Sequence, residues 1–349
     1  MDDVSTGLPM VSVLMAACNA ESTIAEAVDS VLRQTYPNLE LIVVDDGSTD
    51  RTAAILATYG ERIRVMSQAN CGLSSARNAG CRAARGDFFA LMDADDRCAP
   101  QRINAQMAVM RQFEDVALCS TEFSAFDLNG VIAERFARQY YSMLGDTPNA
   151  LNTLFPRAER VTAGGDFSVR LGSAYPDLAF GNFLHPPTLL FPRSTFEAAG
   201  PFDQTLCNHA DWEWIVRAAR TGQVAYVDVP LLEYRISSTQ RSASSRRVER
   251  AGDLQVVITK IWNADPAPPA GMKPRRHALL AALWLDVADA LSEDDKWKAM
   301  KYLGQSTVLH RGAGVRSVKV FLKILTPLSL LRTLRRIRGR DETGAMLPP

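Results

Sequence analysis

Phe88-Phe89-Ala90-Leu91-Met92-Asp93-Ala94-Asp95-Asp96 is an apolar run of strand length that ends in three carboxylates within four positions. Burying such charges unpaired is costly, so we expect them at the open edge of an α/β sheet, where ligands bind. Asp93 and Asp95 can face one point, and their hard oxygen atoms suit Mg²⁺ or Mn²⁺. For this motif taken alone, a solvated acidic turn is the commoner alternative. The sequence upstream therefore decides between the two.

The first 126 residues alternate strand patterns with helix patterns. Strands are expected at 10–17, 39–44, 63–67, 88–92 and 116–126, with helices at 20–34, 49–59, 73–84 and 102–113. This alternation predicts an α/β fold with a mostly parallel sheet, flanked by helices and joined by right-handed crossovers. By contrast, residues 130–185 have weak periodicity and several prolines. They predict an irregular region that covers the sheet and shapes a pocket.

Further along the chain, the pattern changes from mixed to helical. Short strands are expected at 188–191, 224–229 and 231–236, with helices at 194–199 and 211–221 and a polar loop at 237–247. Helices follow at roughly 248–263, 275–292, 294–309 and 315–338. We therefore predict a catalytic domain over 1–236, with halves at about 8–126 and 127–236. A loop and a helical C-terminal region follow over 237–349.

The composition excludes several classes of protein. The 349 residues carry no net charge, but 311–340 hold nine Lys or Arg and no acidic residue, which leaves the rest at about −9. That balance argues against a nucleic-acid-binding protein with a basic body. The six cysteines form no C-x-x-C pair, as is typical of reduced thiols rather than of a disulfide or zinc framework. No signal-peptide pattern or run of 18 apolar residues occurs, so a cytoplasmic protein is expected.

Several motifs together closely resemble the ordered signature of family 2 glycosyltransferases. They are VSVLMAACNA at 11–20, LIVVDDGSTD at 41–50, GLSSARNAG at 72–80, DADD at 93–96, GPFD at 200–203, DWEW at 211–214 and LEYR at 232–235. The resemblance implies the GT-A nucleotide-diphospho-sugar transferase fold, followed here by a C-terminal helical extension. It implies inverting transfer of a sugar from a nucleotide diphosphate sugar, a UDP-sugar by family habit, to an acceptor hydroxyl. Such enzymes serve cell-surface polysaccharide or glycolipid assembly.

The resemblance also assigns nucleotide-binding roles. Asp46 would accept a hydrogen bond from uracil N3, and Arg77 with Asn78 would lie in a helix that crosses near the base and ribose. The alternatives are a turn residue for Asp46 and a structural ion-pair partner for Arg77. Cys18 stands where the family usually has tyrosine, so an aromatic contact is missing from the pattern. The full nucleotide-binding set implied is Ala16, Ala17, Asn19, Asp46, Arg77, Asp93 and Ala94.

The family's D-x-D motif implies a metal ligand, and its downstream aspartate implies a general base. Asp95 would bind the Mn²⁺ or Mg²⁺ cofactor that neutralises the diphosphate, with Asp93 as a second candidate ligand. Asp96 is expected just outside the ligand set or as a helix cap. Some relatives place a metal-binding histidine where this chain has Ser237. Asp211 would take the proton of the acceptor hydroxyl, with a plain helix N-cap as the alternative.

Two further segments carry expectations about phosphate and membrane. Arg241 and Arg246, in the polar loop, can close over the diphosphate because guanidinium suits phosphate geometry, or can belong to a solvated linker. The basic amphipathic segment 315–338, interrupted by Pro327, can lie on an anionic membrane surface at the inner face of the cytoplasmic membrane. Alternatively, it packs on the domain with a solvated basic end. The tryptophans and histidines near the acceptor side are expected to be packing, structural or surface residues: Trp212, Trp214, His185 and His209.

Rival functions fit the motifs less well. A phosphatase with a D-x-D nucleophile requires Thr or Val at the position of Arg97. A dinucleotide dehydrogenase requires G-x-G-x-x-G after the first strand, and this chain lacks that motif there. A catalytically silent glycosyltransferase-like binding or scaffold subunit is the remaining alternative, since Ala210 replaces a common glutamate. The expected partners are the donor and a carbohydrate or lipid-linked acceptor, with no nucleic acid. No motif in 130–210 specifies the sugar or the linkage.

Overall fold

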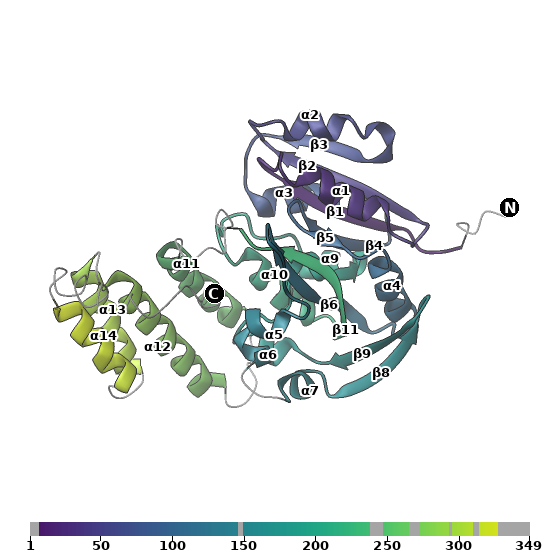
Figure 1. The fold of residues 1–349 in the computed structure, drawn as a ribbon. Helices are drawn as coiled ribbons and strands as arrows, with labels where there is room; N and C mark the ends of the chain where they lie inside the picture. The colour runs from purple at the N-terminus through teal and green to yellow at the C-terminus, as the bar shows by residue number, and fades with distance from the viewer. Residues whose placement is uncertain are drawn as a thin grey trace. The chain divides into compact units, whose positions relative to one another are not determined.

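The computed structural model describes residues 7–145, 149–237, 247–264, 272–292, 295–309 and 314–326. The chain divides into two compact units, residues 1–237 and 238–349 (Figure 1). The first unit contains the sheet and the second is helical. Arg241 and Arg246, with most of the basic residues of the C-terminal tail, lie outside the described residues.

The sheet of the first unit has the order β3-β2-β1-β4-β10-β6-β11-β9-β8. Strands β3, β2, β1 and β4 run parallel, as do β6 and β11, whereas β10 is antiparallel to its neighbours β4 and β6. The sheet is thus mixed but mostly parallel, as predicted. The main strands are β1 (Val11–Ala17), β2 (Leu39–Asp46), β3 (Arg64–Gln68), β4 (Phe88–Asp93), β6 (Val116–Asp127), β10 (Leu190–Pro192) and β11 (Gln223–Arg235).

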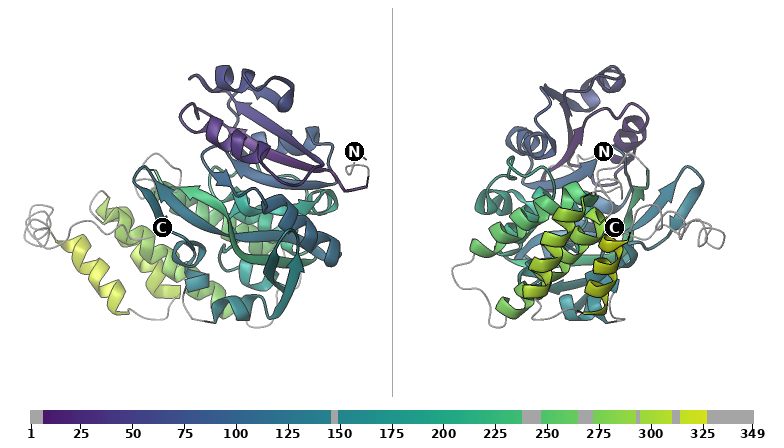
Figure 2. Two further views of the ribbon diagram at one scale, coloured as in Figure 1. Left: turned by 45° about the vertical axis from the view of Figure 1, so that its right-hand side comes forward. Right: turned by 90° about the vertical axis from the view of Figure 1, so that its left-hand side faces the viewer.

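Helices lie on both sides of the parallel strands in the views of Figure 2. In α1 (Ile24–Leu32) the apolar residues recur at helical spacing and are buried, so this helix turns one face to the core. The others in this half are α2 (Thr52–Ala57), α3 (Leu73–Ala83) and α4 (Arg102–Gln112), with a 3₁₀ turn at Gly60–Arg62. Later in the chain come α9 (Arg193–Ala199) and α10 (Ala210–Ala219), with a second 3₁₀ turn at Pro186–Thr188.

The strand register brings three carboxyl ends to one edge. Ala16 of β1 lies opposite Val44 of β2 on one side and Asp93 of β4 on the other. Ala17 lies opposite Asp45, one residue before the end of β2. The loops that follow these three strands therefore start side by side, as parallel strands require.

The prediction of an irregular region over 130–185 is wrong. It contains the hairpin of β8 (Arg157–Thr162) and β9 (Asp166–Gly172), and β9 adds antiparallel to β11. The short β7 (Gly130–Ala133) pairs with β6. Helices of four or five residues fill the rest: α5 (Ala137–Tyr140), α6 (Ser142–Gly145), α7 (Ala150–Leu154) and α8 (Tyr175–Leu178).

The two strands expected at 224–229 and 231–236 are one strand, β11. Its pairing with β6 shifts register on both sides of Pro230. Proline has no amide proton to donate, and an irregularity in the ladder accommodates it without ending the strand. The short β5 (Arg97–Cys98), which was not predicted, pairs antiparallel with Leu232 and Glu233 of β11. This pairing brings the chain just after the acidic turn onto the end of β11.

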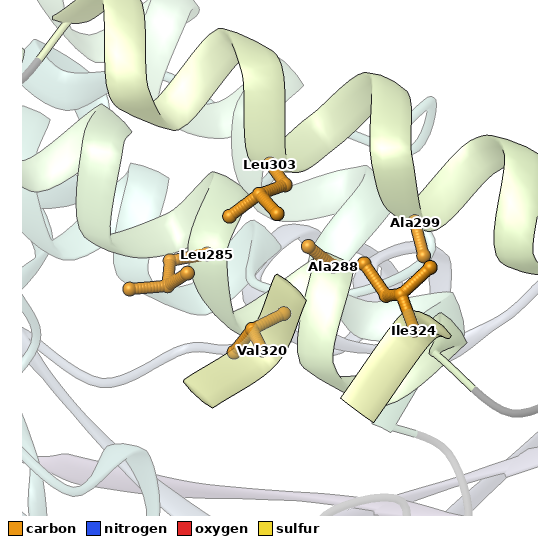
Figure 3. Packing of buried hydrophobic residues seen from close by; sticks show 6 residues of the cluster. All are labelled: Leu285, Ala288, Ala299, Leu303, Val320 and Ile324. Carbon is orange, nitrogen blue, oxygen red and sulfur yellow. The ribbon is translucent and has the colours of Figure 1, made fainter. Parts of the chain in front are cut away.

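The second unit consists of helices, as predicted. They are α11 (Arg247–Asn263), α12 (Met272–Leu291), α13 (Lys296–Leu309) and α14 (Val315–Leu325). Figure 3 shows the apolar core that α12, α13 and α14 share, formed by Leu285, Ala288, Ala299, Leu303, Val320 and Ile324. Within the described part of the chain, no helix has both the length and the apolar character needed to cross a membrane.

Candidate active site at the carboxyl edge of the sheet

Three carboxylates gather where β4 ends. Asp93, Asp95 and Asp96 each offer an oxygen, and these atoms lie within 4.8 Å of one another. Asp96 is only 1% exposed, and its Oδ2 atom has no hydrogen-bond partner among the described residues. Burial, and then the charges of Asp95 and Asp93, raise the pKa of Asp96 well above its usual value. Closely spaced hard oxygen donors that repel one another fit a divalent cation such as Mn²⁺ or Mg²⁺.

The structure places Arg77 against this acidic cluster. Its Nη2 atom lies 3.0 Å from Asp93 Oδ1, and its side chain is 5% exposed. This ion pair fits the structural alternative for Arg77, and its nucleotide-binding role stays a prediction. Asn78 lies in the expected helix, α3, where its side chain is buried and exchanges two 2.8 Å hydrogen bonds with the Phe202 backbone. Asn78 ties α3 to the segment before α10.

Asp46, at the end of β2, organises the loop that leads into α3. Its carboxylate accepts hydrogen bonds from the Cys71 amide at 2.9 Å, the Gly72 amide at 2.8 Å and Gln68 Nε2 at 2.7 Å. Gly47, directly after it, has φ of 72°, and a Cβ there would come within 2.6 Å of the Asn70 amide nitrogen. Glycine at 47 is therefore required for the two loops to approach so closely. The contact of Asp46 with a uracil base stays a prediction.

The loop after β1 is tied to the loop after β2. Asn19 has a left-handed backbone with φ of 50°. Its Oδ1 atom accepts from the Thr49 amide at 2.8 Å, and its own amide donates to Ser48 Oγ at 2.9 Å. Asn70 Nδ2 also donates to Cys18 Sγ at 3.2 Å, which links the loop before α3 to the loop after β1. The loops after β1 and β2 and the one before α3 thus form a connected rim next to the acidic cluster.

Asp211 lies in the first turn of α10, behind a left-handed residue. The helix begins at Ala210, and His209 before it has φ of 58° without a side-chain capping bond in the described structure. The Asp211 carboxylate accepts the Trp212 amide at 2.8 Å and is half-buried. Asp211 is therefore inside the helix and does not occupy the N-cap position named as its alternative. A general-base role for Asp211 stays a prediction.

The two tryptophans around Asp211 hold α10 in place. Trp212 Nε1 donates to the Leu178 carbonyl at 2.7 Å, and Trp214 Nε1 donates to the Gly200 carbonyl at 2.8 Å. Both side chains are buried. The prediction that they are packing residues is confirmed. An aspartate carried on so firmly anchored a helix has a well-defined position.

A buried aromatic cluster lies within electrostatic reach of both Asp93 and Asp211. His185 stacks on Phe123 with ring centroids 4.4 Å apart, and its Nδ1 atom lies 3.2 Å from the Tyr141 hydroxyl. Burial lowers the pKa of His185 to about 4, so the ring is neutral at pH 7. Burial raises the pKa of Tyr141 well above its usual value, and Tyr140, Asp211, Tyr234 and Asp93 raise it further. Sequence reasoning missed Tyr141, although the Tyr140-Tyr141 pair was a usable signal.

The chain is similar to known glycosyltransferases. Residues 12–153 match the model of glycosyl transferase family 2. An uncharacterized glycosyltransferase of Rickettsia prowazekii is 26% identical over 250 residues, which is 70% of each chain. The putative glycosyltransferase EpsE of Bacillus subtilis is 35% identical over 171 residues, covering 46% of this chain and 62% of that protein.

Two solved structures share the fold. TarS residues 1–349 of S. aureus, solved in complex with UDP, superpose with a TM-score of 0.54 at 16% identity, over 86% of this chain and 89% of that one. The mannosyltransferase PcManGT of Pyrobaculum calidifontis, in complex with GDP-Man and Mn²⁺, gives a TM-score of 0.54 at 20% identity, over 97% and 82%. These matches agree with the GT-A fold that the family resemblance implied.

Proposed function

Because this chain belongs to glycosyltransferase family 2, we propose that it transfers a sugar from a nucleotide diphosphate sugar, a UDP-sugar as donor class, to an acceptor hydroxyl with inversion. The observation that carries the proposal is the group of three carboxylates within 4.8 Å at the carboxyl edge of the sheet. They lie beside the rim formed by the loops after β1 and β2. The acidic turn suits a metal ion and the diphosphate. The neighbouring rim suits the nucleoside.

In this proposal Asp95, with Asp93, holds a divalent cation, Mn²⁺ or Mg²⁺. When bound, that ion neutralises the negative charge that develops on the departing diphosphate. Arg77 holds Asp93 in place through their ion pair. The nucleoside would lie along Ala16, Ala17, Asn19, Asp46 and Ala94, which stand at the carboxyl ends of β1, β2 and β4 or directly after them. TarS complexes with UDP and UDP-GlcNAc, and the PcManGT complex with GDP-Man and Mn²⁺, support a nucleotide-sugar donor.

The chemistry of inversion gives Asp211 its role. The acceptor oxygen forms a bond to the anomeric carbon while the bond from that carbon to the diphosphate oxygen breaks on the opposite face. Asp211 takes the acceptor proton, and the nucleoside diphosphate leaves with the electron pair. His185 is neutral at pH 7. A neutral His185 ring adds no charge near Asp93 and Asp211, between which the sugar ring would lie.

The test is turnover of a panel of UDP-, GDP- and dTDP-sugars by the purified protein, with Mn²⁺ or with EDTA. We expect hydrolysis or transfer from at least one UDP-sugar with Mn²⁺ and its loss with EDTA. Turnover restricted to a GDP- or dTDP-sugar would reassign the donor. No turnover of any donor, despite nucleotide binding, would instead favour the silent binding subunit.

We also propose that α14 supports peripheral contact with the inner face of the cytoplasmic membrane, where a lipid-linked acceptor would be found. Its outer side exposes Val318, Phe321, Leu322 and Leu325, whereas Val320 and Ile324 pack in the core. The basic residues of this helix contribute less than the sequence suggested, because Arg316 pairs with Asp286 and Lys323 with Asp289. In the described part of the C-terminal region, the exposed apolar side of α14 is therefore the main feature that would bind a membrane surface.

Replacing Phe321 and Leu325 together by glutamate is expected to lower sedimentation with anionic vesicles while turnover of a water-soluble acceptor is kept. Removing α14 would expose the core residues that it covers, so surface substitution is the cleaner experiment. Val308→Glu is the matched control, since Val308 is also exposed but lies on α13. A wild-type protein that ignores such vesicles at low salt would disprove the membrane proposal.

A further inference from the structure

We propose that Arg235, the last residue of β11, is a positioning residue that sets the geometry of the acidic turn before any metal ion binds. This inference rests on the proposed metal site at Asp93 and Asp95. It concerns how the chain keeps three mutually repelling carboxylates at a fixed spacing. Like charges at such distances push apart unless other groups hold them.

Arg235 contacts the turn at two consecutive residues. Its Nε atom donates to the Asp95 carbonyl at 2.8 Å, and its backbone amide donates to Asp96 Oδ1 at 3.0 Å. One residue thus fixes both the peptide that carries the Asp95 side chain and the carboxylate of Asp96. Asp96 is only 1% exposed, so this amide hydrogen bond to Oδ1, and not contact with solvent, holds its carboxylate.

The guanidinium of Arg235 is itself fixed at its far end. Its Nη2 atom lies 2.7 Å from Glu26 Oε2 in the first turn of α1, and its Cζ atom lies 4.5 Å from the Phe126 ring centroid. The Arg235 side chain is 15% exposed, whereas that of Glu26 is 51% exposed. A planar guanidinium can make the Asp95 and Glu26 contacts simultaneously, which a lysine ammonium at the same place cannot.

Arg97 provides an internal comparison. Its Cζ atom lies 4.0 Å from the same Phe126 ring, its Nε atom donates to Glu233 Oε2 at 2.7 Å, and its Nη1 atom lies 3.6 Å from Glu26 Oε2. Its side chain makes no such contact with Asp95 or Asp96 in the described structure. The two arginines share an aromatic face and an acidic partner, but Arg235 alone of the pair contacts the acidic turn.

The experiment compares Arg235→Lys with Arg97→Lys in Mn²⁺ titrations followed by the EPR signal of the free ion, without nucleotide and with UDP. We expect Arg235→Lys to bind Mn²⁺ about 10-fold more weakly, the scale at which outer residues tune metal affinity. Arg97→Lys should bind as the wild type does. In turnover assays the Mn²⁺ concentration for half-maximal activity should rise for Arg235→Lys, whereas the rate at saturating Mn²⁺ should largely recover.

Each outcome decides the inference. Unchanged Mn²⁺ affinity in Arg235→Lys would overturn it, because the expected effect would be absent. An equal loss of affinity in Arg235→Lys and Arg97→Lys would also overturn it, because the effect would then be common to both arginines beside Phe126. A wild type that binds no Mn²⁺ would refute the metal site itself, and the inference with it. Should Arg235→Lys not fold, Glu26→Gln serves as the second variant. It should weaken Mn²⁺ binding about 3-fold, the scale of one hydrogen bond, and no loss would again overturn the inference.

Discussion

Asp211→Asn is expected to leave donor binding nearly unchanged and to lower turnover by about 10²–10⁴-fold, the usual scale of a general base. Asparagine keeps the Oδ1 atom that accepts the Trp212 amide, so the first turn of α10 can persist. The anchors of the helix, the two tryptophan indoles bonded to backbone carbonyls, are untouched. The variant thus removes the proton acceptor while retaining shape.

The measurement is single-turnover transfer together with calorimetric titration of the donor nucleotide. Asp166→Asn is the matched control, because Asp166 is an exposed carboxylate on the β8–β9 hairpin bonded to Thr162. That control should have wild-type turnover. Near-normal turnover in Asp211→Asn would return Asp211 to a structural role and leave the base to be found elsewhere.

Local patterns predicted the part of the fold in which local and tertiary preferences agree. In this part of the chain β1 and β4 carry continuous apolar runs and α1 carries an apolar face, so periodicity suffices for them. The carboxyl-edge position of Asp93 follows from strand direction alone, because parallel strands end at one edge. The resemblance added the family and roles that periodicity could not supply.

The β8–β9 hairpin shows how a usable signal was misinterpreted. The tight turn lies at Gly164-Gly165, with φ of 70° at Gly164 and the Ala163 amide hydrogen-bonded to the Gly165 carbonyl. Phe167, Val169 and Leu171 alternate along β9 and are buried. A glycine pair followed by period-two alternation is a hairpin signal.

Other features of the site could not be predicted from local sequence. Arg235 and Glu26 are 209 residues apart in the chain, and their contact arises only when β11 ends beside α1. Asn78 directly follows Arg77, but adjacent residues on a helix point in different directions. Arg77 therefore faces Asp93 while Asn78 faces Phe202. Such pairings depend on tertiary register, which one sequence does not display.

Asp95→Asn is expected to abolish the Mn²⁺ dependence of nucleotide diphosphate binding. For the wild type we expect UDP to bind about 10²-fold more tightly with Mn²⁺ than with EDTA, about 3 kcal/mol, as befits charged contacts between diphosphate, ion and carboxylate. Asparagine has nearly the same shape as aspartate but no charge. Asp93 and Asp96 alone should therefore bind the divalent ion more weakly. Arg77 contacts Asp93 Oδ1, and Arg235 contacts the Asp95 backbone carbonyl. The substitution removes neither contact.

Calorimetric titration of UDP with Mn²⁺ or EDTA, on wild type and Asp95→Asn, measures this difference directly. Melting temperature without metal provides the folding control, and it should be equal in the two proteins or slightly higher in the variant, since the substitution removes one of three repelling charges. Equal UDP affinity with Mn²⁺ and EDTA in the wild type would refute the metal site. Retained Mn²⁺ dependence in the variant would instead transfer the ligand role to Asp93, which stands closest to the nucleotide rim through the pairing of β4 with β1.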